Sequence, residues 1–206
     1  MGHVQHSQVI DYPDIADAVW TKLAHAANDA ASTMRLMAVA TVGPGDNPCN
    51  RMMVLRGANR EAGHIWFHTD RRSPKIHHFK SRPYISALAY DDTDRVQVRI
   101  DLRVTLHKGD AVARQHWEQT SMVVRFAYGM FLAPGAAVNG VQRHADPRMF
   151  ALRQQHTKGR LAESYQNFVV IEVGVEASDW LQVAETDQRR ALLRAESAWT
   201  PEPFVP

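Results

Sequence analysis

A strict alternation of apolar and polar residues over positions 96–107 constrains this chain more than any other feature. Apolar side chains occupy every second position: Val96, Val98, Ile100, Leu102, Val104 and Leu106. Polar side chains fill the positions between them: Gln97, Arg99, Asp101, Arg103 and Thr105. Because successive side chains of a strand point to opposite faces, this period of two predicts a long strand with one buried face and one solvated face.

Several shorter segments also have the composition of strands and are bounded by turn-forming residues. They are Met34–Val42, Arg51–Arg56, His64–Thr69, Tyr84–Tyr90, Phe168–Val175, Asp179–Ala184, which we expect to follow a turn, and Arg189–Leu193. Short connections favour antiparallel neighbours. The sequence therefore predicts an antiparallel β-barrel with helices, of the α+β class, in which closure of the sheet removes exposed strand edges.

Helices are expected before and between these strands. Apolar residues recur at helical spacing from Pro13 to Ala31, and Trp20 in that segment is expected in the core. The other predicted helices are Ser73–Lys80, Gly109–Gln119 and about Asp146–Gln155. The tail Trp199–Pro206 contains three prolines and is expected to lie irregularly on the surface. We predict one domain over 1–206, with its barrel core at about 34–108 and 168–194.

Composition excludes several classes of protein. The chain has 206 residues, of which 45% are hydrophobic, so it can bury a sizeable core. A formal net charge of +2 gives no argument for a nucleic-acid partner or a membrane surface. The single cysteine, Cys49, excludes an internal disulfide and a cysteine-rich metal site. No apolar run is long enough to span a bilayer, and we expect a cytoplasmic protein without a bound metal.

Cations and hydroxyl groups gather in one stretch, Asn50–Lys75. The predicted strand Arg51–Arg56 has an arginine at each end, and Thr69 closes the next strand. Ser73 followed by proline is typical of a helix start, and Lys75 lies in the first turn. Such donors suit a phosphate group. The alternative is a hairpin with ordinary solvated charges, which is the commoner origin of a charge cluster.

The segment resembles the flavin-binding signature of the pyridoxamine 5′-phosphate oxidase-like split-barrel family. That signature has a strand R-x-x-x-x-(K/R), a strand ending in (Y/H)-T-(N/D), and S-x-K at a helix start. Here they read as Arg51–Arg56, Phe67–Asp70 and Ser73–Lys75. A family strand of the form R-Q-V-R-(V/I)-x-G corresponds to Arg95–Asp101. The match is specific from about Met34 to Lys108.

The resemblance implies FMN as the cofactor and an antiparallel FMN-binding split barrel as the fold. Arg51 and Lys75 would hold the phosphate, His68 and Thr69 would lie beside the ring and phosphate, and Gln97 would bind the cofactor from a neighbouring strand. The implied cofactor-binding residues are Arg51, Met52, Met53, Val54, Leu55, Arg56, His68, Thr69, Ser73, Lys75 and Gln97. Because family members share each flavin between two subunits, a homodimer is implied, and Met122–Leu132 is our candidate for part of its interface.

Departures from the family concern the substrate. Pro74 stands where the vitamin B6 oxidases have arginine, so Arg71 or Arg72 would have to compensate at the phosphate. No convincing equivalents of the oxidases' substrate-phosphate residues occur in His116–Val124, and their C-terminal R-L-H-D-R motif is absent. The sequence thus predicts an FMN-dependent oxidoreductase with an altered substrate pocket, an unknown small-molecule substrate and no assignable catalytic residues.

Another class of function stays open: a non-catalytic carrier of flavin, deazaflavin or haem with the same fold. His77 and His78 invite a haem or metal interpretation. However, adjacent residues of a helix point about 100° apart, so these two side chains do not converge on one ion. A hydrolase is disfavoured because serine and histidine residues are scattered without a catalytic motif.

Overall fold

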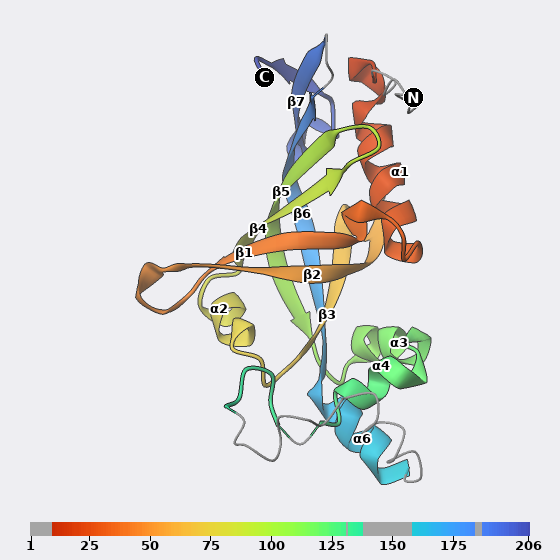
Figure 1. The fold of residues 1–206 in the computed structure, drawn as a ribbon, viewed down its shortest axis with the longest axis vertical. Helices are drawn as coiled ribbons and strands as arrows, with labels where there is room; N and C mark the ends of the chain where they lie inside the picture. Colours follow the sequence, from red (N-terminus) through yellow and green to blue (C-terminus); the bar gives the residue numbers. More distant parts are fainter. Residues whose placement is uncertain (1–9, 131, 138–157, 184–186) are drawn as a thin grey trace, which may run out of the picture.

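Strands β1 to β6 form a closed antiparallel barrel in the computed structural model, which describes residues 10–130, 132–137, 158–183 and 187–206 (Figure 1). The strands are β1 Leu36–Val42, β2 Pro48–Asn59, β3 His64–Asp70, β4 Tyr84–Asp91, β5 Val96–His107, β6 Phe168–Val183, β7 Gln188–Arg194 and β8 Glu202–Phe204. Their order in the sheet is β3-β2-β1-β4-β5-β6-β7-β8, and pairing of β3 with β6 closes the ring. The predicted antiparallel barrel with helices is confirmed.

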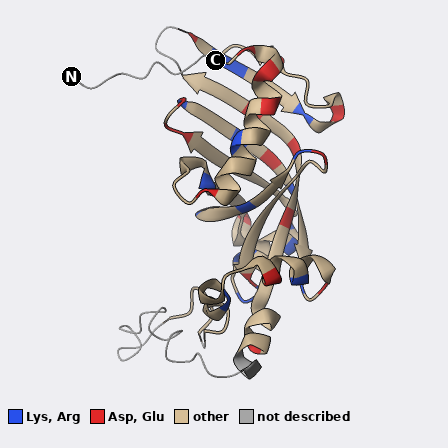
Figure 2. Cartoon of the chain, turned by 90° about the vertical axis from the view of Figure 1, so that its right-hand side faces the viewer, with Lys and Arg blue, Asp and Glu red and all other residues tan. Residues whose placement is uncertain are grey.

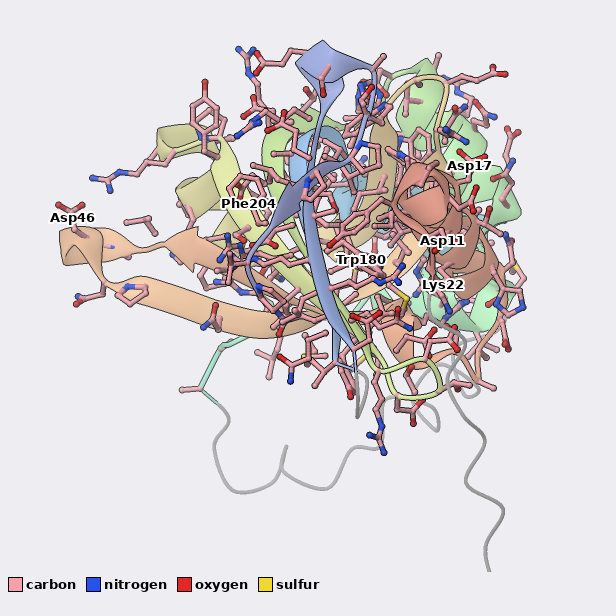
Figure 3. The ribbon with its side chains drawn as sticks, turned by 90° about the horizontal axis from the view of Figure 1, so that it is seen from above. Asp11, Asp17, Lys22, Asp46, Trp180 and Phe204 are labelled. Atoms are coloured by element: carbon pink, nitrogen blue, oxygen red, sulfur yellow. The ribbon has the colours of Figure 1, made fainter. Side chains whose placement is uncertain are left out.

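The period-two segment is strand β5, and its apolar face lies in the barrel core. Val96, Val98, Ile100 and Leu102 are buried, whereas Arg99 on the other face is exposed. Trp180 of β6 and Phe67 of β3 are among the largest fully buried side chains of this core. Figure 3 shows Trp180 in the middle of the molecule and Asp46 at the tip of the projecting β1–β2 hairpin.

Strand β6 corrects the expected turn before Asp179. It runs without interruption from Phe168 to Val183, and a β-bulge opposite Asp101 and Leu102 takes the place of the turn. Beyond the bulge, Trp180 points into the core, and Asp179 faces Arg99 and Arg190 on the neighbouring strands at 2.9 and 2.8 Å. A bulge absorbs one extra residue while pairing continues. The polar segment Glu176–Asp179 therefore does not end the strand.

The C-terminal tail is also more regular than expected. Its three-residue strand β8 pairs with β7, and Arg194 of β7 donates to Glu202 at 2.6 Å. Pro203 is accommodated because β8 is the last strand of the sheet, where a missing N–H breaks no interior ladder.

Helices lie against several parts of the barrel (Figure 1). The helices are η1 Tyr12–Asp14, α1 Ile15–Asn28, η2 Thr33–Arg35, η3 Pro44–Asp46, α2 Lys75–Ser81, α3 Ala111–Gln119, α4 Met122–Ala127, α6 Lys158–Asn167 and η5 Ala195–Ser197. Helix α1 buries the predicted core residue Trp20, whose ring meets Trp199 edge-on at 5.5 Å. The helix predicted at Asp146–Gln155 lies outside the described residues.

Helices α3, α4 and α6 gather at the opposite end of the barrel from the chain termini (Figure 1). A small apolar cluster joins them to the outer face of β3 and β6, with Ala113, Phe168 and Val170 fully buried. The rings of Trp117 and Phe168 lie 5.2 Å apart in this cluster. The cluster fixes α3 against the barrel, beside the site described below.

Basic and acidic side chains are not separated onto different faces of the described part of the molecule. Basic and acidic residues are interspersed along the chain (Figure 2), which agrees with the small net charge. Among the described residues, no helix combines the length and apolar character needed to cross a membrane.

Replacing the N-cap of α3 should cost a modest amount of stability. Asp110 accepts a hydrogen bond from the backbone N–H of Ala113 at 2.8 Å and also contacts His107 Nδ1 at 2.9 Å. We expect Asp110→Ala to lower the free energy of unfolding by about 1 kcal/mol, because an N-cap contributes roughly that much. Urea unfolding measures the loss, and Asp110→Asn, which keeps a cap acceptor, should lose less. Equal losses for both variants would contradict the cap assignment.

Candidate functional site

Three of the predicted cofactor residues form a hydrogen-bonded cluster where β3 leads into α2. The ammonium group of Lys75 donates to Thr69 Oγ1 at 3.1 Å and to Ser73 Oγ at 2.7 Å. Both hydroxyl-bearing residues are buried, and Lys75 is half-buried. Helix α2 starts at Lys75, two residues later than predicted, so Ser73 contacts the lysine side chain and makes no side-chain cap. These residues form the phosphate cluster, together with Arg51.

Arg51 approaches the same cluster from strand β2. Its Nη1 donates to the carbonyl of Val39 at 3.1 Å and to Thr41 Oγ1 at 2.8 Å. Strand β2 begins at Pro48 and ends at Asn59, so Arg51 and Arg56 lie within it and not at its ends as predicted. Arg51 shares its face with the buried Met53, which turns it toward the barrel interior.

The electrostatics of the phosphate cluster favour an anion. Burial lowers the pKa of Lys75, and the charge of Arg51 lowers it further. Burial also lowers the pKa of Arg51. The carboxylate of Asp70 opposes this effect at Lys75, but it is held by Arg72 through contacts of 3.0 and 2.7 Å. Two desolvated cations with hydroxyl donors beside them fit a phosphate monoester, the terminal group of FMN.

Neither arginine before Pro74 joins this cluster. Arg72 binds Asp70 and also donates to the carbonyls of Met130 and Tyr128 at 2.8 and 3.3 Å. Arg71 Nε donates to Asn167 Oδ1 at 2.9 Å. The sequence suggested that one of the two would compensate for the proline. In the structure both guanidinium groups are engaged elsewhere.

The remaining predicted residues of β2 divide between the two faces of the strand. Met53 and Leu55 are buried in the barrel core, so only their backbone groups are available to a cofactor. Met52 is exposed and Val54 is partly exposed on the outer face. Arg56 lies in a β-bulge, since the register against β3 shifts between Leu55 and Gly57.

Arg56 and His68 lead to a cavity of about 340 Å³ between the barrel, α1 and α3. Its polar lining comprises Asn28, Arg35, Arg56, His68, His116, Gln119, Thr120 and Ser121. Among the described residues, no carboxylate lines it. Burial lowers the pKa of Arg56, and the nearby Arg35 lowers it further. The cavity is therefore cationic and shares two residues with the predicted flavin site.

His68 is held in a single arrangement by its neighbours. Its Nε2 lies 3.1 Å from Nδ1 of His116, so one ring donates and the other accepts. The ring also meets Phe168 edge-on, with centroids 4.8 Å apart. Burial, His116 and Arg56 together lower the pKa of His68 to about 3, so it is neutral at physiological pH. Its buried Nδ1 has no hydrogen-bond partner among the described residues.

Gln97 stands apart from the other predicted residues. It lies on β5, which is separated from β2 by β1 and β4, or about 14 Å at the usual strand spacing. Its partners across the sheet are Tyr90 and Leu181. Within one chain, Gln97 does not reach the phosphate cluster.

Sequence reasoning missed most of the cavity lining, including the cationic Arg35 and the imidazole of His116. Arg35 precedes β1 and is brought to the cavity by tertiary packing alone. His116 lies on α3 and Val124 on α4, and the chain between the two helices is extended at Thr120 and Ser121, so no single helical face in the sequence indicates this group. All four residues line the cavity.

Comparisons with known proteins agree with this fold. Residues 17–108 match the family described as pyridoxamine 5′-phosphate oxidase, FMN-binding domain. A pyridoxamine 5′-phosphate oxidase-related, FMN-binding protein of Nostoc punctiforme is similar in structure, with a TM-score of 0.71 and 23% identity over 92% of this chain and 96% of that chain. PhzG of Burkholderia lata, solved with tetrahydrophenazine-1-carboxylic acid, has a TM-score of 0.67 and 15% identity over 100% and 98% of the two chains. No curated protein matches the chain.

The fold and the matched segment define an FMN-binding split barrel. Residues 17–108 match the model of the FMN-binding domain of the pyridoxamine 5′-phosphate oxidase family, which agrees with the resemblance predicted from the sequence. The predicted cofactor, FMN, is the cofactor of that domain.

Proposed function

We propose that the protein is an FMN-dependent oxidoreductase, built as one split-barrel domain, whose substrate pocket differs from that of the vitamin B6 oxidases. The observation that carries the proposal is the phosphate cluster: Lys75 and Arg51 are desolvated cations, and the carboxylate of Asp70 is already bound by Arg72. When bound, FMN supplies hydride-transfer chemistry. The cavity beside Arg56 supports a catalytic role, because it offers a small molecule access next to the cofactor residues.

The roles of the chain's own residues follow from where they lie. Arg51 and Lys75 bind the phosphate, and Thr69 and Ser73 orient the lysine. Arg56 would supply positive charge to a bound flavin ring and would favour its reduced, negatively charged form.

We propose further that the protein is a cytoplasmic homodimer that shares its flavins between subunits. Strands β1, β2 and β4 expose apolar residues on their outer face: Leu36, Met52, Leu88 and Tyr90. They are neighbours, since Ala38 pairs with both Met52 and Leu88, and Tyr90 pairs with Gln97. A partner covering this face would meet Gln97, which is distant from the phosphate cluster of its own chain. Met122 and Val123, in the other segment suggested for the interface, are also exposed.

The absorption spectrum of the purified protein tests the cofactor assignment. We expect a flavin doublet and, after heat release, a small molecule with the mass of FMN. Reduction and reoxidation of the bound flavin faster than those of free FMN under the same conditions would support the oxidoreductase over a carrier. A Soret band would replace the proposal with a haem carrier, and a colourless protein that also fails to take up added FMN would contradict it.

Charges placed on the outer sheet face should disrupt the dimer. In Met52→Glu/Leu88→Glu, carboxylates would be buried without partners, so we expect the dimer dissociation constant to rise at least about tenfold. Light scattering after size exclusion measures the mass over a concentration series. Val205→Glu, at an exposed position of the C-terminal tail, is the control and should remain dimeric. A double variant that dimerises like the wild type would place the interface on another face.

A further inference from the structure

Two arginines line the cavity beside Arg56, and among the described residues only one of them has hydrogen-bond partners. Arg35 donates to the carbonyls of Ala26 and Ala27 at 3.3 and 2.7 Å, so its guanidinium closes the end of α1. Arg56, in contrast, makes no hydrogen bond or ion pair with any described residue, and burial lowers its pKa. A half-buried guanidinium that faces a cavity without carboxylates is suited to an anionic ligand.

A second group in the cavity can exchange a proton. His116 on α3 is hydrogen-bonded through Nδ1 to His68, and its Nε2 has no partner among the described residues. If His116 becomes protonated, its Nδ1–H can donate to Nε2 of the neutral His68, leaving Nε2–H for a ligand. The rings of Trp66 and His116 lie 5.9 Å apart, which supports the position of this imidazole.

Burial disfavours the protonated form of His116 while the cavity holds no anion. Burial lowers its pKa, His107 of β5 lowers it further, and Glu172 of β6 acts in the opposite direction. His68 faces it from β3, and Arg56 and Arg35 share the cavity. Tyr128, which lies near Arg56, stays a neutral phenol because burial raises its pKa to about 12. A negative charge brought next to His116 would raise the pKa of its imidazole.

We propose that this cavity binds a small, singly charged organic anion through Arg56, and that His116 takes up a proton as the anion binds, with His68 as its positioning residue. The ligand class is a planar carboxylic acid, because one guanidinium and one imidazolium donor match a carboxylate. A carboxylate has two oxygens, one for each donor group, whereas the third oxygen of a phosphate monoester would have no cationic partner, because Arg35 is engaged with the end of α1. The inference rests on the proposed function, in which the same cavity admits the substrate to the flavin. His116 is then positioned to return its proton to the ligand or to receive one from it.

Calorimetric titration of the FMN-loaded protein tests the charge requirement. Benzoate is the probe, benzamide is its neutral isostere, and phenyl phosphate is the dianion. We expect benzoate to bind at least about tenfold more tightly than either of the others. In Arg56→Gln this preference for benzoate over benzamide should disappear, whereas Arg114→Gln, an exposed arginine on α3, should retain it. Equal affinities for benzoate and benzamide in the wild type would overturn the proposal.

Proton uptake tests the role of the histidine pair. Titrations in two buffers of different ionisation enthalpy give the number of protons taken up with benzoate. We expect a positive number that falls to zero in His116→Gln, and benzoate affinity that rises between pH 8 and pH 6 in the wild type only. His68→Gln keeps an acceptor for His116 and should retain part of the uptake, whereas His68→Leu should lose it. Uptake that persists in His116→Gln would refute the assignment.

The flavin spectrum of the same samples separates the two proposals. A yellow protein that does not distinguish benzoate from benzamide overturns the anion cavity and leaves the proposed function standing. A protein that binds no FMN overturns the proposed function, while the titration still tests whether the cavity binds carboxylates.

Discussion

The double variant Arg51→Gln/Lys75→Met is expected to purify without flavin. Each residue would lose a charge-assisted hydrogen bond to the phosphate, which contributes about 1.5–3 kcal/mol. The two together correspond to about 3–6 kcal/mol, or a roughly 10²–10⁴-fold higher dissociation constant for FMN. Fluorescence titration of the flavin-free protein with FMN measures this change. If the double variant stays fully yellow, the phosphate cluster does not bind the cofactor.

The fold of this variant should survive, because the two cations oppose each other in the flavin-free protein. Burial and the charge of Arg51 lower the pKa of Lys75, which means that the charged form of the lysine is held at a cost. Without FMN, the variant should therefore unfold at a similar or higher temperature than the wild type. The matched control is Lys80→Met/Arg114→Gln, which removes two exposed charges from α2 and α3. The control should bind FMN like the wild type.

The local sequence pattern predicts a residue's burial or contacts where these depend only on its own strand or turn. The alternation in β5 predicted which side chains are buried, from Val96 to Leu102. Ser73 and Lys75 lie two residues apart, and Thr69 is the second-last residue of the preceding strand, so their cluster needs only one strand and one turn. The sequence could predict it because little of the barrel has to be known.

Residues whose position depends on strand order could not be placed in this way. The contact predicted between Gln97 and the flavin would have to cross two strands within one chain, so this prediction depends on the proposed partner subunit. The face to which Arg56 belongs depends on a bulge against β3, and Asp179 lies within a strand because Arg99 and Arg190 flank it. His116 acquires a role only when α3 packs beside β3. The positions of these residues depend on which strands and helices pack together across the chain. The local sequence pattern gives no information on that packing.

Between pH 7 and pH 5 the free energy of unfolding of the wild type is expected to fall by about 2 kcal/mol more than that of His68→Gln. The pKa of His68 is about 3 in the folded protein and 6.5 in the unfolded chain. Between these values the unfolded state binds more protons, so stability falls as the pH falls through this window and is fully present above it. At pH 5 the histidine lies about 1.5 pH units below its unfolded pKa, and one unit corresponds to about 1.4 kcal/mol.

Urea unfolding of the FMN-saturated protein at both pH values gives this difference directly. The sign follows from burial: protonating His68 would place a charge beside Arg56 and His116 in a desolvated site, so the folded state resists the proton. Burial also lowers the pKa of His116, which adds a contribution of the same sign. His25→Gln, at an exposed position of α1, is the control and should lose stability in parallel with the wild type. If His68→Gln also runs parallel to the wild type, His68 is not held neutral by the fold, and the cavity that we assign to an anion is more open to water than its geometry indicates.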